Sequence, residues 1–82
     1  MKLYFISVYE KSRNICDYIE GENLMDALKK FHLLHNVDNN YNDMHIKRIY
    51  RNMQMRHSIE QIARRNGYII NQLKQKEYEN RA

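Results

Sequence analysis

The chain has 82 residues, one cysteine and a formal net charge of +4. A domain of this size has one core that supplies only about 3–5 kcal/mol of stability, and a lone cysteine excludes an intrachain disulfide. A single thiol is typical of a reducing compartment, and the apolar residues 3–9 are too few for a membrane span or a signal peptide. We therefore expect one cytoplasmic domain over residues 1–82.

The charge is divided unevenly along the chain. Residues 1–41 carry five Lys and Arg against six Asp and Glu, whereas residues 42–82 carry nine against four. A basic half beside a near-neutral half predicts a docking surface for something acidic, either nucleic acid or an acidic protein surface.

A hairpin is the first predicted element. Residues 2–9 are rich in β-branched and aromatic side chains, which favours a strand. Residues 10–14 are polar and of hairpin-loop length, and residues 15–20 are predicted as the returning strand, which Gly21 ends.

A helix is predicted next, over residues 24–35. Asn23 is a suitable N-cap, and apolar residues recur at helical spacing from Leu24 to Leu34. Asn36 can end the helix in the left-handed conformation, and residues 36–43 form a polar loop.

Residues 44–53 fit either of two structures. Ile46, Ile49, Tyr50 and Met53 have helical spacing, yet residues 45–51 also have the composition of a strand. We prefer the strand, because a two-stranded hairpin is seldom stable alone and a third strand provides a sheet for the helix to cover.

A last helix is predicted to open at a capping box formed by Ser58 and Gln61, and Gly67 either breaks it or lies inside it. The fold class is therefore α+β, a small three-stranded sheet in the order β-β-α-β-α with a C-terminal helix. We expect a set of apolar residues from the first strand and both helices to meet in one core: Leu3, Phe5, Leu24, Leu28, Phe31, Ile59 and Ile62.

The third predicted strand carries a basic and aromatic cluster that could hold phosphates and stack a base: Lys47, Arg48, Tyr50, Arg51 and Arg56. On a strand, however, Arg48 and Tyr50 share one face while Lys47 and Arg51 share the other, which divides the charge. The alternative is a charged edge strand that resists aggregation.

Residues 59–73 resemble the helix-turn-helix pattern of DNA-binding repressors. The resemblance makes Ala63 the small residue that lets two helices pack closely, Gly67 the turn, and Leu73 the apolar residue that closes the core. It implies that four polar residues face a DNA groove: Asn71, Gln72, Gln75 and Lys76.

The same stretch also fits one amphipathic helix with a short heptad seam. Asn66 would then stand at an a position, where a polar residue sets the register of a dimer. A homodimer contact is predicted for three apolar residues that a small sheet would leave uncovered: Ile69, Ile70 and Leu73.

Signals for catalysis and for metal binding are weak. His32 and His35 lie three apart on a helix but have no cysteine near them in sequence, so we predict no metal site and no cofactor. Cys16 is expected to be structural, and no catalytic residue is predicted. A small basic toxin-type ribonuclease, acting through scattered Arg, Lys, His and Tyr, is a third alternative.

In size, composition and element order the chain resembles small phage and mobile-element inhibitors of host defence, including anti-CRISPR proteins. The resemblance implies a non-enzymatic protein that docks onto a protein or nucleoprotein partner. The alternative is a nucleic-acid-binding regulator that uses residues 59–73. Either partner would contact the basic and polar residues of the second half: Lys47, Arg48, Tyr50, Arg51, Arg56, Arg64, Arg65, Gln72 and Lys76.

Overall fold

The computed structural model describes residues 1–37, 43–52 and 54–80, with side chains as far as Glu77. The elements follow the predicted order: β1 (Lys2–Glu10), β2 (Arg13–Gly21), α1 (Leu24–His35), β3 (Asp43–Ile49) and α2 (Arg56–Asn80). The prediction of an α+β fold with one three-stranded sheet and a C-terminal helix is confirmed. No helix in the described part of the chain is long and apolar enough to cross a membrane.

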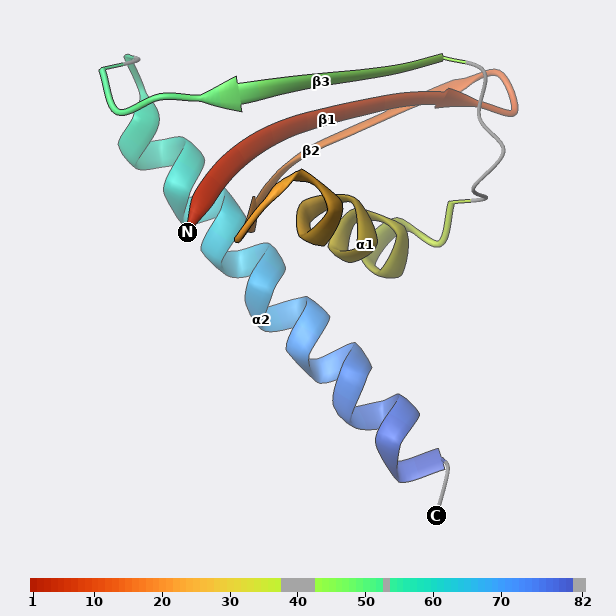
Figure 1. Ribbon diagram of the computed structural model, residues 1–82. Helices are drawn as coiled ribbons and strands as arrows, with labels where there is room; N and C mark the ends of the chain where they lie inside the picture. The colour runs from red at the N-terminus through yellow and green to blue at the C-terminus, as the bar shows by residue number, and fades with distance from the viewer. Residues whose placement is uncertain (38–42, 53, 81–82) are drawn as a thin grey trace.

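The sheet is antiparallel, and β1 lies in its centre between β2 and β3 (Figure 1). The loop between β1 and β2 is shorter than predicted, because the strands continue to a turn of two residues, Lys11 and Ser12. Both have positive φ, 51° and 63°, which matches the twist of two-residue hairpin turns.

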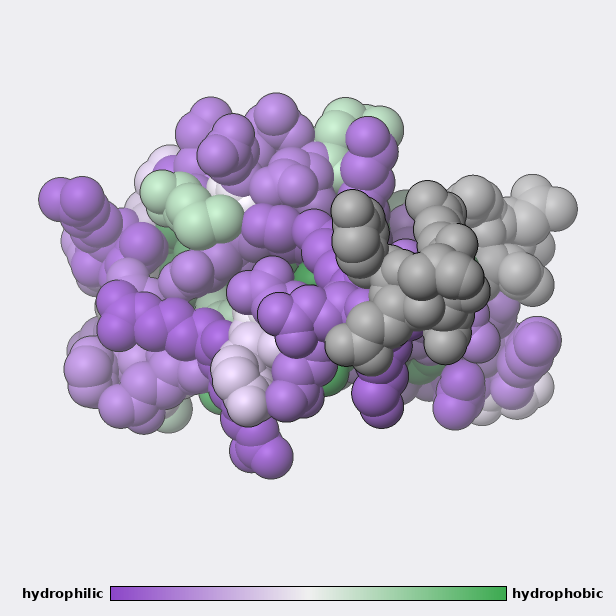
Figure 2. Space-filling model, turned by 90° about the horizontal axis from the view of Figure 1, so that it is seen from below, coloured by the Kyte–Doolittle hydropathy of each residue, from purple (hydrophilic) through white to green (hydrophobic). Residues whose placement is uncertain are grey.

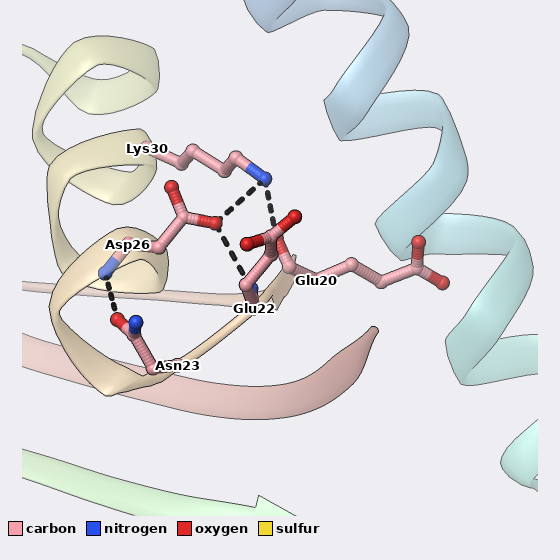
Figure 3. A network of polar contacts seen from close by, with 5 residues as sticks. All are labelled: Glu20, Glu22, Asn23, Asp26 and Lys30. Carbon is pink, nitrogen blue, oxygen red and sulfur yellow. Dashed lines mark hydrogen bonds and ion pairs between the residues drawn. The ribbon is translucent and has the colours of Figure 1, made fainter.

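Local polar contacts hold α1 at both ends, as the sequence predicts. The Asn23 side chain accepts the backbone N–H of Asp26, and Asn36 adopts the left-handed conformation at the other end. Asp26 also accepts the N–H of Glu22 and pairs with Lys30 at 3.1 Å (Figure 3). Lys30 in turn donates to the Glu20 carbonyl, which ties α1 to the end of β2.

The strand prediction for residues 44–53 is confirmed in its first part, since β3 ends at Ile49. Leu3 of β1 lies opposite Ile49, and Tyr4 lies opposite Arg48. In the described sheet β3 pairs with β1 alone, so it is an edge strand. This is the position that the alternative interpretation, a charged edge strand that resists aggregation, requires.

The predicted single core is wrong, because the apolar residues form two clusters on opposite faces of β1. Successive strand residues point to opposite faces, so Tyr4, Ile6 and Val8 pack with Phe31 of α1. Leu3 packs on the other side, in the second cluster, which also includes Phe5 and Ile59. Leu24 and Ile62, at 40% and 43% exposed, are not core residues.

The predicted capping box does not start α2, because the helix begins at Arg56 and Ser58 lies within its first turn. Arg56 Nε donates to Glu60 at 2.6 Å, and its Nη1 donates to the Ile49 carbonyl at 3.0 Å. This contact holds the start of the helix against the end of β3. A capping box, by contrast, involves only residues near one another in sequence, so it does not include such a contact.

The helix then continues without a break through Gly67. The two-helix arrangement of a helix-turn-helix is therefore absent from residues 56–80. Ala63, the small residue of that pattern, is buried in the sheet cluster with Leu3 and Ile49.

The middle of α2 packs against β2 within the same chain. Asn66, which is 8% exposed, donates its Nδ2 to the Tyr18 carbonyl of the edge strand β2 at 2.9 Å. Asn66 therefore has an intrachain partner, which contradicts its assignment to a dimer seam. Beyond this contact α2 runs past the sheet, and its last turns lie away from it (Figure 1).

Candidate functional site

The basic residues of β3 and the following turn do not form one patch, as strand alternation predicts. Lys47 and Arg48 are neighbours in β3 and so point to opposite faces of the sheet. Lys47 is exposed and Arg48 is half-buried. Tyr50 and Arg51 follow the strand, and both are exposed.

Arg56 is a structural residue in this arrangement. Its guanidinium is occupied by Glu60 and by the Ile49 carbonyl, and its side chain is 19% exposed. The guanidinium of Arg56 is therefore used within the chain and is poorly available to a partner.

The predicted residues on α2 lie on its exposed surface. Arg64, Arg65, Gln72 and Lys76 are all exposed. Gln72 donates to the Tyr68 hydroxyl at 3.0 Å, one turn earlier on the helix. Basic and amide groups therefore line the part of α2 that faces solvent.

A shortage of acids distinguishes the segment that contains β3 and most of α2. From Met44 to Lys76 the sequence has a single acid, Glu60, which is the partner of Arg56. The remaining cations of this segment have no ion pair within the described residues: Lys47, Arg48, Arg51, Arg64, Arg65, Lys74 and Lys76. The segment therefore presents positive charge with little internal neutralisation.

The N-terminal half uses acids for its own structure. Asp17 of β2 accepts from His35 Nε2 at 3.0 Å. Burial disfavours the ionised Asp17, but hydrogen bonds from His35, the Asn66 amide and the Tyr18 N–H outweigh it and lower the Asp17 pKa. The Glu22 backbone N–H, together with Lys30, lowers the pKa of Asp26.

A cleft of about 440 Å³ lies beside Arg64, between the end of β2, α1 and α2. Gly67 is on its wall, and a Cβ at this position would meet nothing within 4 Å. Lys30, with its ammonium group between α1 and the end of β2 (Figure 3), also lines the cleft. The exposed surface of α2 is therefore hollowed next to one of its cations.

The three predicted dimer residues are only partly accessible. Ile70 is buried within the chain, at 2% exposed, so the premise that the sheet leaves it uncovered is wrong. Ile69 and Leu73 are half-buried. The face seen from below is mostly hydrophilic, with only small separate hydrophobic areas (Figure 2).

Other singled-out residues have ordinary surroundings. Cys16, expected to be structural, is exposed on β2. His35 contacts Asp17, and His32 Nδ1 lies 3.0 Å from the Val37 carbonyl. The described residues contain no cluster of three or more His, Cys, Asp or Glu that could hold a metal ion.

Comparisons with protein-family models, curated proteins and solved structures found no match to this chain.

Proposed function

We propose that the chain is a non-enzymatic binding protein that docks onto an acidic surface of a protein or nucleoprotein partner through exposed cations of residues 44–76. The observation that carries this proposal is the acid-poor segment, whose single acid is already paired with Arg56. Long-range attraction to an acidic surface grows with such unneutralised charge, and it raises the rate of association.

The geometry of α2 supports a role as the contact element. A helix of 25 residues is about 37 Å long, and its exposed cations lie on a rigid element that extends beyond the sheet (Figure 1). Small phage and mobile-element inhibitors of host defence, such as anti-CRISPR proteins, are often single domains of this size with no catalytic motif. We assign the chain docking without catalysis as its mode of action.

The test is capture of the partner from a bacterial lysate by the tagged protein, with and without nuclease treatment. Arg64→Glu/Arg65→Glu should abolish capture while the melting temperature stays close to that of the wild type, because both residues are exposed. The matched control is Lys11→Glu/Arg13→Glu, which reverses two exposed cations at the hairpin turn and should retain the partner. Equal capture by both double variants would refute the proposal.

Direct binding of nucleic acid is the second candidate. The observation that favours it is the set of exposed aromatic and amide side chains between the cations of α2: Gln61, Tyr68, Asn71, Gln72 and Gln75. A direct binder should retain duplex DNA or RNA without any protein partner, with affinity that falls steeply as salt is raised. Capture that survives nuclease treatment favours the protein partner instead.

A further inference from the structure

Arg48 is held in an unusual position on the face of the sheet that carries Tyr4. It lies directly opposite Tyr4 in the pairing of β1 with β3. Its guanidinium carbon is 5.6 Å from the centroid of the Tyr4 ring and 5.4 Å from that of the Tyr50 ring. Cation–π contacts with two rings restrict the guanidinium to one region of this face.

The Nε of Arg48 is buried and has no hydrogen-bond partner among the described residues. A buried donor without an acceptor is destabilising and is rare in folded proteins. Arg56, by contrast, uses its Nε for Glu60 and its Nη1 for the Ile49 carbonyl. The hydrogen-bond donors of Arg56, which has a structural role, are thus used within the chain. The Nε donor of Arg48 has no acceptor among the described residues.

Two aromatic rings contact Arg48, and two further cations follow from the strand register and the sequence. Lys2 and Tyr4 share a face of β1, since they are two residues apart, and Lys2 is exposed. Arg51 is exposed a few residues further on, and Tyr50 is 62% exposed. No carboxylate of the described residues forms an ion pair with these three cations. These three cations are therefore not neutralised by an ion pair with a described carboxylate.

We propose that Arg48 and Tyr50 form a site for one nucleotide of a single-stranded nucleic acid. The Nη groups of the guanidinium donate to the phosphate, because Nε is buried, and the exposed ring of Tyr50 stacks on the base. A fork of donors suits phosphate, and successive phosphates of a strand would reach Lys2 and Arg51. A carboxylate would use the guanidinium but not the ring, and a base inside a duplex has no free face to stack.

The inference rests on the proposed function and narrows its partner to a nucleoprotein with an accessible strand. The experiment measures fluorescence anisotropy of a labelled single-stranded oligonucleotide of mixed sequence. Arg48→Met keeps an unbranched side chain beside the two rings and removes the unmet donor. We expect it to melt at or above the wild-type temperature and to bind about tenfold or more weakly.

Two further variants distinguish the stacking of a base on Tyr50 from the general attraction of the oligonucleotide to positive charge. Tyr50→Leu should weaken binding by about tenfold, because stacking on an aromatic ring contributes strongly for each base. Arg13→Met removes an exposed cation at the start of β2 and should bind like the wild type. Inorganic phosphate at equal ionic strength should not displace the oligonucleotide, and displacement would mean a site for free phosphate.

The inference is overturned if Arg48→Met binds with wild-type affinity, or if it melts far below the wild type, since Arg48 would then be structural. It is also overturned if the wild type does not bind the oligonucleotide. Binding of polyglutamate that depends on Arg48 would then assign the site to a carboxylate. If Arg64→Glu/Arg65→Glu loses the partner while Arg48→Met keeps it, the proposed function stands and the nucleotide site does not.

Discussion

Replacing Asn66 tests how α2 is attached to the sheet. Asn66→Ala removes the amide that donates to the Tyr18 carbonyl at 2.9 Å and that helps to keep Asp17 ionised. Asn66 is 8% exposed, so water replaces its hydrogen bond poorly. Loss of one buried donor typically lowers the free energy of unfolding by about 1–3 kcal/mol.

Asn71→Ala is the matched control, because Asn71 is an exposed asparagine of the same helix. Both variants gain the better helix propensity of alanine, up to about 0.7 kcal/mol. The difference between them therefore isolates the contact of Asn66. For a domain of this size, a difference of about 2 kcal/mol separates the two melting temperatures by about 8–16 °C.

Thermal unfolding followed by circular dichroism gives both melting temperatures, and the scans are repeated at several protein concentrations. The Asn66→Ala variant should melt lower than Asn71→Ala at every concentration, because the lost contact lies within one chain. Equal melting temperatures would refute the packing of α2 on β2. A wild-type melting temperature that rises with concentration, and no longer does so in Asn66→Ala, would restore Asn66 to a dimer seam.

Three further predictions concern the core around Phe31, the helix α2 at Gly67, and the loss of stability at acid pH. Phe31→Ala should lower the free energy of unfolding by about 3–5 kcal/mol in urea titrations, because the ring is fully buried, and a loss under about 1 kcal/mol would contradict the packing. Gly67→Ala should raise the free energy of unfolding by about 0.8–1 kcal/mol, and the melting temperature with it, because the added Cβ enters open space. A lower melting temperature would show that the helix is strained at this position. Burial disfavours the ionised Asp17, but hydrogen bonds outweigh the burial and hold its folded-state pKa below the ordinary value of an aspartate carboxyl. The ionised form therefore stabilises the fold above that ordinary pKa, and the contribution disappears as the pH falls through the folded pKa. Stability measured between about pH 2 and 5 should therefore fall less steeply in Asp17→Asn than in the wild type, and parallel curves would exclude this role.

Short-range features of the fold could be predicted from the sequence. The helix over residues 24–35 has its predicted bounds, because Asn23 and Asn36 act on backbone groups of their own helix. The hairpin follows equally from residues near one another in sequence. For the candidate site, the basic second half and the alternation of Lys47 and Arg48 on a strand could also be predicted.

The tertiary structure decided the features that depend on residues far apart in the chain. Asn66 is polar in an apolar pattern, and only its contact with Tyr18, 48 residues away, explains why it is buried. The start of α2 is set by the contact of Arg56 with the end of β3, not by the nearer Ser58. Arg48 becomes distinctive only because the register of β3 places it opposite Tyr4. Capping and periodicity act over a few residues, whereas strand order, helix docking and hydrogen-bond satisfaction are settled by the competition of distant segments for the same buried surface.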